Sequence, residues 1–265
     1  MDGSALKEAW ERDGFVSPLT LIGAEEAAEH RAALERAEAQ VGPLHYWDKI
    51  HTVLRSPMEL ATSLDLLDAV AQLIGPDILI YNVAYIIKEP HTPAKITWHQ
   101  DLTYWGLDGD AEVGAWIALS PATAASGCMA MIPGSHRHGE LEHRVTDDES
   151  NILHHGQEIS SLDEGSAVLC DLQPGEASLH HGWTVHSSRP NTSDDRRIGL
   201  NIQYIAPSMR QTVHDLDTAM LVRGSDRFGH FGVDLPAEED LEPVAMRRRE
   251  EASRLLKSTY DSAAG

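Results

Sequence analysis

Residues 96–101 of this chain are Ile-Thr-Trp-His-Gln-Asp, a stretch whose spacing of potential metal ligands fits a β-strand. Side chains alternate between the two faces of an extended strand, so His99 and Asp101 are expected to point one way and Gln100 the other. Another histidine, His186, lies in a later run of apolar and β-branched residues that predicts a second strand. If the two strands lie side by side, two imidazoles and one carboxylate can bind a single cation.

Two histidines and one carboxylate form the donor set of open, mononuclear non-haem iron(II) sites, in which the face opposite the three protein ligands stays free. Coincidence is the alternative, because the chain has 15 His and one His-x-Asp triplet is a weak signal. Arg197 supports the metal interpretation, because it opens the apolar stretch 197–205 shortly after His186. Its planar guanidinium stays protonated and can pair with a carboxylate through two parallel hydrogen bonds, which suits an anchor for 2-oxoglutarate.

The sequence resembles the phytanoyl-CoA dioxygenase family of iron(II)/2-oxoglutarate oxygenases. The segments that carry the resemblance lie in the family's order within residues 75–206; they are residues 96–101, 113–119, 127–136, 181–191 and 196–197. The resemblance implies that His99, Asp101 and His186 are the iron ligands and the catalytic centre. It also implies a double-stranded β-helix, the jelly roll of cupin-like proteins.

The resemblance further implies that Arg197 binds 2-oxoglutarate, with Ser188, two residues after the second histidine, as a helper. The neighbouring Arg196 is a rival for this role. If Arg197 points into the barrel, strand alternation sends Arg196 outward, so only one of the two can serve. Asn82 and Tyr85, on the strand before the motif, are candidates for hydrogen bonds to the co-substrate carboxylate next to the metal, or else for satisfying backbone groups.

Tyr104 and Trp105 lie just beyond the metal motif and are candidates for contact with a substrate, with core packing as the competing interpretation. Gln203 and Arg137 are further candidates. Asp101 favours hydroxylation over halogenation, because chlorine-transferring enzymes of this kind have a small residue there, where halide binds. We therefore expect a hydroxylase that uses dioxygen and 2-oxoglutarate, releases succinate and CO2, and acts on a small molecule such as an amino acid, a natural-product intermediate or an acyl thioester.

Two other function classes stay open. A cupin-type metalloenzyme could use the same three ligands without 2-oxoglutarate and without Arg197, and it would form no succinate. A non-catalytic binding descendant of the fold would consume no oxygen; this class is disfavoured because the three candidate ligands and the arginine are all present.

The order of predicted elements indicates a mainly β protein with flanking helices. Helices are predicted at residues 5–12, 24–40, 64–74 and 238–260, and strands at residues 78–88, 113–119, 128–132, 167–172, 178–181 and 197–205. We expect one domain over residues 1–265. Its parts are helical cover over 1–75, a jelly-roll core over 76–206 and a C-terminal helical segment over 236–260.

The longest region without periodicity is rich in histidine and is expected to be a loop or lid. It covers residues 136–155 and contains His136, His138, His143, His154 and His155. A second metal site made from these histidines is the weaker interpretation, because their spacing is irregular.

The formal net charge is -21, from 42 acidic and 21 basic residues. Such a surface repels phosphate backbones, so a nucleic-acid partner is not expected. No apolar run reaches the roughly 18 residues of a membrane helix, and no signal-peptide pattern is seen. Together with the presence of only two cysteines, Cys128 and Cys170, these features favour a cytoplasmic protein without a membrane partner. The oligomeric state stays open.

Overall fold

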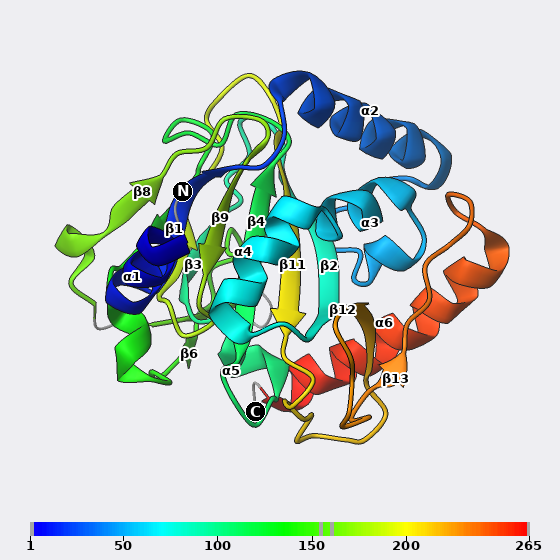
Figure 1. Ribbon diagram of the computed structural model, residues 1–265. Helices are drawn as coiled ribbons and strands as arrows, with labels where there is room; N and C mark the ends of the chain where they lie inside the picture. The colour runs from blue at the N-terminus through cyan, green and yellow to red at the C-terminus, as the bar shows by residue number, and fades with distance from the viewer. Residues whose placement is uncertain (1–2, 154–155, 160–161, 264–265) are drawn as a thin grey trace.

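The computed structural model describes residues 3–153, 156–159 and 162–263. β-Sheets occupy its centre and helices lie around them (Figure 1). The larger sheet has, in the described part of the chain, seven strands in the order β1-β9-β4-β11-β2-β12-β13. Their bounds are β1 Phe15–Thr20, β2 Ile78–Lys88, β4 Glu112–Ala118, β9 Glu176–His180, β11 Arg197–Ile205, β12 Thr218–Arg223 and β13 Gly232–Val233. The predicted mainly β class with flanking helices is confirmed.

The smaller sheet has the order β3-β10-β5-β8, and all its neighbouring strands are antiparallel. Its strands are β3 Ile96–His99, β5 Met129–Met131, β8 Val168–Cys170 and β10 His186–Ser188, and a separate pair is formed by β6 Arg144–Val145 and β7 Gln157–Glu158. The register places His186 opposite His99 on one side and opposite Met131 on the other. The smaller sheet therefore brings the two predicted histidine ligands next to each other.

β2 and β11 form the centre of the larger sheet, and all eleven residues of β2 are buried. Alternate side chains of β2, such as Val83 and Tyr85, belong to the main hydrophobic core on the outer face of the sheet. The intervening side chains Asn82, Ala84 and Ile86 line a cavity on the inner face. Burial on both faces explains why β2 is a nearly continuous apolar run.

The helices include 3-10 turns η1, η2 and η4. Their bounds are α1 Gly3–Asp13, α2 Ala24–Val41, η1 Ile50–Thr52, α3 Arg55–Ala61, α4 Leu64–Ile74, α5 Leu102–Trp105, η2 Ser135–His138, η4 Glu164–Ser166 and α6 Pro243–Ala263. Figure 1 shows α3 and α4 over β2 and β11. α4 buries Leu66, Leu67 and Val70 on the sheet and ends before Gly75, whose φ of +95° favours glycine. Within the described residues, no helix has the length and apolar character needed to cross a bilayer.

The predicted bounds of the jelly-roll core are too narrow. β1 lies inside the stretch that was expected to be helical cover, and β12 and β13 follow residue 206, yet all three join the larger sheet. β1 contains Pro18, which lowers its strand signal but is tolerated because β1 is an edge strand. β12 and β13 are short and partly exposed, so their sequences carry little periodicity.

Candidate metal centre

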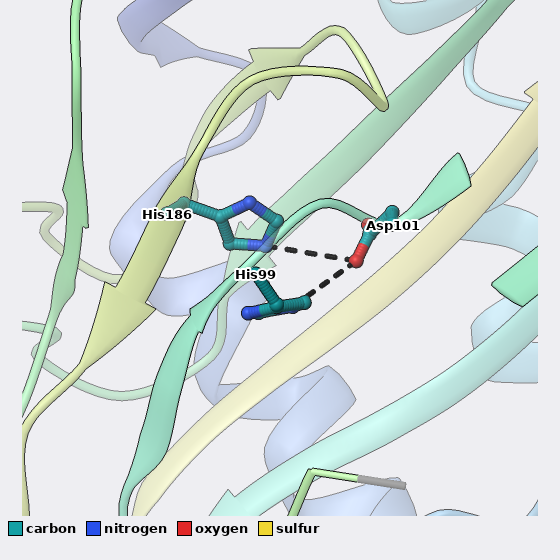
Figure 2. A group of neighbouring side chains, drawn as sticks. All are labelled: His99, Asp101 and His186. Atoms are coloured by element: carbon teal, nitrogen blue, oxygen red, sulfur yellow. Dashed lines mark ion pairs between the residues drawn. The ribbon is translucent and has the colours of Figure 1, made fainter. Parts of the chain in front are cut away.

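His99, Asp101 and His186 converge on one point between the sheets (Figure 2). Their potential ligand atoms all lie within 4.8 Å of one another. Asp101 Oδ1 is 3.3 Å from His99 Nε2 and 3.6 Å from His186 Nε2. Among the residues that the structure describes, these three form the one group of at least three histidine, cysteine or carboxylate side chains whose ligand atoms lie close enough together to bind a metal ion.

Asp101 reaches the centre by a different route from the one expected. β3 ends at His99, and Asp101 has helical dihedrals of φ -65° and ψ -43° directly before α5. Strand alternation is therefore the wrong reason for its orientation; the turn into α5 directs the carboxylate back toward the imidazoles. Gln100 does point away, and its side chain bonds to Gly139 O, Trp183 O and Leu141 N, which ties the metal motif to the following loops.

Backbone carbonyls fix the orientation of both imidazoles. His99 Nδ1 lies 2.8 Å from Thr97 O, and His186 Nδ1 lies 2.9 Å from Thr184 O. Because a carbonyl only accepts hydrogen bonds, each Nδ1 carries a proton, and Nε2 is the ring atom of each histidine that is directed at the centre. This is the usual outer support of histidine ligands in metal sites.

The electrostatics suit a bound cation. Burial opposes the charge on Asp101, but the imidazoles of His186, His180 and His99 outweigh it and hold the pKa of Asp101 well below its ordinary value. Burial, with a further effect of His99, lowers the pKa of His186 to about 3. At neutral pH the centre thus presents a carboxylate and a neutral imidazole at His186, as metal binding requires.

His180, which the sequence interpretation missed, holds the second oxygen of Asp101. Its Nε2 lies 3.3 Å from Asp101 Oδ2, and the residue is only 1% exposed. Gly114 is the register partner of His180 across β4 and β9, and a Cβ at Gly114 would lie 2.5 Å from His180 Nε2. The imidazole can therefore occupy this place only because residue 114 has no side chain. A contact between residues so far apart in the chain leaves no local sequence signal.

Gly114→Ala is expected to displace His180 and to weaken nickel(II) binding by about 10- to 100-fold, the usual effect of losing an outer partner of a metal ligand. Isothermal titration with the metal alone measures this. Gly109→Ala is the matched control, because a Cβ there would meet only Met209 Cγ at 3.9 Å. His180→Gln, which keeps an N–H donor, should retain more affinity than His180→Leu. Equal affinities in the two His180 variants would contradict the orienting role.

A cavity of about 490 Å³ opens from the metal centre and is lined by residues of both sheets, Arg197 among them. Arg197 is 1% exposed, its Nη1 donates to Gly127 O at 2.8 Å, and its guanidinium lies 5.1 Å from the Trp116 ring centroid. Arg197 Nε and Nη2 are buried and have no hydrogen-bond partner among the described residues. Burial lowers the pKa of Arg197 to about 10. Such a guanidinium fits a ligand carboxylate.

Ser188 and a second buried base, Lys88, adjoin Arg197. Lys88 is the register partner of Arg197, and its Nζ donates to Ser188 Oγ at 2.6 Å. Burial and the charge of Arg197 lower the pKa of Lys88 to about 6. Because Ser188 Oγ accepts from Lys88, its own hydroxyl proton is available to a ligand in the cavity, which Ser188 lines. Lys88 was not singled out from the sequence, since a lysine at a strand end is common.

Arg196 points outward, as strand alternation requires if Arg197 points inward. Its guanidinium bonds bidentately to Glu38 at 2.8 and 3.0 Å and also pairs with Glu89 at 3.0 Å. The structure therefore leaves Arg197, and not Arg196, facing the cavity.

The remaining predicted site residues fall into two groups. Asn82, Tyr104 and Trp105 line the cavity, and so does Gln203. Tyr85 does not: it lies on the opposite face of β2, in the main hydrophobic core, and its assignment to co-substrate binding is wrong. Strand alternation already separates residues 82 and 85, because an odd spacing puts them on opposite faces.

Arg137, the other candidate for substrate contact, bonds to the backbone of Arg12 and is not among the residues that line the cavity. The histidine-rich stretch 136–155 begins with η2 and includes β6. His136, His138 and His143 form no metal-binding group in the described part of the chain. His154 and His155 lie outside the described residues.

The similarity of this chain to known proteins agrees with this geometry. Residues 10–199 match the family model for phytanoyl-CoA dioxygenase (PhyH). The chain is 33% identical over 121 residues to phytanoyl-CoA dioxygenase 1 of Oryza sativa subsp. japonica, covering 46% of this chain and 42% of that protein. It is 30% identical over 166 residues to a probable alpha-ketoglutarate-dependent hypophosphite dioxygenase of Stutzerimonas stutzeri, covering 62% and 55%. The chain thus spans about half the length of the curated relatives it matches.

Among solved structures, the chain is similar to the non-heme monooxygenase ThoJ in its apo form. The TM-score is 0.87 at 33% identity, over 98% of each chain. This likeness confirms the jelly-roll fold that the family resemblance implies. The family model covers well over half of the sequence, and the matched region contains the whole metal centre and Arg197. The chain therefore belongs to the phytanoyl-CoA dioxygenase (PhyH) family.

Proposed function

We propose that this protein is an iron(II)- and 2-oxoglutarate-dependent oxygenase that hydroxylates an unactivated C–H bond of a small organic molecule and releases succinate and CO2. One observation carries the proposal. Two imidazoles and one carboxylate face the same cavity as a buried arginine whose Nε and Nη2 have no partner in the described part of the protein.

The residues fit the two absent groups. His99, Asp101 and His186 would hold iron(II), because two histidines and one carboxylate match its preference for a facial three-ligand site. Arg197, supported by Lys88 and Ser188, would hold the distal carboxylate of 2-oxoglutarate. When bound, iron(II) supplies the oxidising chemistry together with dioxygen and 2-oxoglutarate.

The chain's own groups have four tasks in this proposal. His180 and the Thr97 and Thr184 carbonyls keep the ligand atoms aimed at one point. The Arg197 guanidinium and the Ser188 hydroxyl orient the co-substrate, and the apolar parts of the cavity wall limit access of water to the reacting atoms. Asp101 occupies the position that a halide would need, which favours hydroxylation over halogenation.

The proposed substrate is a small molecule that fits beside 2-oxoglutarate in the cavity; an amino acid, a natural-product intermediate and an acyl thioester are all compatible. Tyr104 and Trp105 form part of its wall. We place the protein in the cytoplasm, a location with which the two free thiols, Cys128 and Cys170, are compatible.

An anaerobic titration tests the proposal. Iron(II) and then 2-oxoglutarate are added to the protein, and the expected result is a weak visible charge-transfer band that appears only with both. Air is then admitted, and oxygen uptake and succinate are measured. A metal-dependent signal without any response to 2-oxoglutarate would favour a cupin-type enzyme that does not use it. Absence of oxygen uptake across a broad substrate panel would favour a non-catalytic binding protein.

A further inference from the structure

The cavity has a second polar region, formed by Asp48, Asn82 and Gln203. These residues are 7%, 4% and 6% exposed, respectively, and all three line the cavity. Asn82 and Gln203 are register partners on β2 and β11, and Asn82 Nδ2 donates to Asp48 Oδ1 at 3.0 Å. Polar side chains this deeply buried are costly unless they find partners, so the cluster needs an explanation.

The position of the cluster separates it from the co-substrate site. Arg197 and Gln203 lie six residues apart on one face of β11, which corresponds to about 20 Å along a strand. Gln203 is instead level with the metal centre: its register partner on β4 is Gly114, whose partner on β9 is His180. Two strand spacings, about 10 Å, thus separate Gln203 from the residue that contacts Asp101. A molecule held at this cluster would extend past the metal.

After the hydrogen bonds within the cluster are formed, one acceptor atom, Asp48 Oδ2, and one donor atom, Gln203 Nε2, have no partner among the described residues. Asn82 Oδ1 accepts a hydrogen bond from Lys49 N at 2.8 Å. This bond fixes the orientation of the Asn82 amide, and Asn82 Nδ2 donates to Asp48 Oδ1. Asp48 Oδ2 receives no hydrogen bond from the described residues. Gln203 Oε1 accepts from Tyr260 OH at 3.4 Å, which leaves Gln203 Nε2 without an acceptor in the described part of the chain. An incoming group would therefore need both a donor and an acceptor.

The Asp48 carboxylate already has positively charged neighbours, so a ligand does not have to supply another positive charge. Burial raises the pKa of Asp48, and the charges of Arg249 and Lys257 oppose that effect. Arg249 Nε also donates to the backbone oxygen of Asp48 at 2.7 Å. Ala84 and Ile86, next along β2 on the same face, are apolar, whereas Asn201 on β11 and Lys257 and Asp261 on α6 also line the cavity, so that charges of both signs already surround the cluster. A neutral group suits this environment better than an ion.

We propose that Asp48 and Gln203 form a substrate subsite for a neutral amide group. The amide N–H donates to Asp48 Oδ2, and the amide carbonyl accepts from Gln203 Nε2. The inference rests on the proposed function only in naming the bound molecule as substrate. Both a primary carboxamide and a secondary amide offer this pair of groups, and the apolar cavity wall holds the body attached to either.

Binding of a matched series of probes tests the subsite. The series shares a phenylbutyl body and consists of 4-phenylbutanamide, its N-methyl and N,N-dimethyl derivatives, 4-phenylbutylamine and 4-phenylbutanoate. Each is titrated calorimetrically into the protein loaded with nickel(II) and 2-oxoglutarate, so that no turnover occurs. We expect one or both N–H amides to bind at least about 10-fold tighter than the other three probes. Tighter binding of 4-phenylbutanamide than of its N-methyl derivative would indicate a subsite for a primary carboxamide, and the reverse order would indicate a subsite for a secondary amide.

Gln203→Glu is the decisive variant, because it replaces the Nε2 donor by an acceptor of the same size. The amide preference should disappear, and 4-phenylbutylamine should gain affinity. Gln173→Glu is the matched control: Gln173 is exposed, lies away from the cavity and should leave the probe order unchanged. Nickel(II) affinity and unfolding temperature, measured for both variants, exclude a general loss of structure.

Tighter binding of the amine or the acid to the unmodified protein, or no binding of any probe at millimolar concentration, would overturn the subsite. An amide preference that survives Gln203→Glu would do the same. Titration of 2-oxoglutarate into the nickel(II) protein is read separately. If that titration fails while the amide preference persists in the metal-loaded protein, the proposed function falls and the subsite stands.

Discussion

Asp101→Ala is expected to abolish 2-oxoglutarate-dependent hydroxylation and to weaken metal binding by more than about 100-fold. Loss of a residue that merely orients a metal ligand already lowers metal affinity by about 10- to 100-fold, and Asp101 is expected to bind the metal itself. Asp101 is the centre of the buried group: its two oxygens contact three imidazoles, and its Oδ1 lies within 3.6 Å of both His99 and His186. Without it, two imidazoles remain and no anionic ligand offsets the cation's charge. Calorimetric titration with nickel(II) measures the affinity, and succinate formation measures activity.

Thermal unfolding gives an independent measurement for this variant. A ligand at 100 times its dissociation constant stabilises the folded state by about 2.7 kcal/mol, so the unmodified protein should unfold at a higher temperature with nickel(II) than without it. Asp101→Ala should lose this increase. Asp194→Ala is the control, because the Asp194 carboxylate is fully exposed at the surface. An undiminished nickel(II) response in Asp101→Ala would remove Asp101 from the set of metal ligands.

The elements with strong periodicity could be predicted from the sequence almost to the residue. β2, β11 and α4 match the predicted ranges because each is long and buries a regular pattern of apolar side chains. β1, β12 and β13 could not be predicted, since short strands at or next to the edge of a sheet depend on pairing with other strands rather than on a periodic pattern of their own. Their place in the sheet is a tertiary property.

The candidate site divides in the same way. The residue types of the centre, two histidines and a carboxylate, follow from the motif, and the outward direction of Arg196 follows from strand alternation. The turn that orients Asp101 does not follow, because nothing local marks the end of β3 at His99. His180 and Asp48 act through contacts across the fold, so the sequence alone gives them no distinguishing pattern.

Arg197→Ala is expected to raise the dissociation constant of 2-oxoglutarate while leaving nickel(II) affinity near that of the unmodified protein. Removing one partner of a buried, hydrogen-bonded charge pair costs about 2–5 kcal/mol, which corresponds to about 30- to several thousand-fold in affinity. The site is arranged for such a pair, because Arg197 keeps two buried N–H positions unpaired and Trp116 restrains its guanidinium from one side. Competition calorimetry with 2-oxoglutarate on the nickel(II)-loaded protein measures the change.

Two further variants separate charge from geometry at Arg197. Arg197→Lys keeps a cation but loses the planar pair of donors, so its 2-oxoglutarate affinity should fall between those of the unmodified protein and Arg197→Ala. Arg196→Ala should leave that affinity unchanged, because Arg196 is engaged by Glu38 and Glu89 outside the cavity. Unchanged 2-oxoglutarate affinity in Arg197→Ala would contradict the assignment of Arg197 as the anchor of the co-substrate carboxylate.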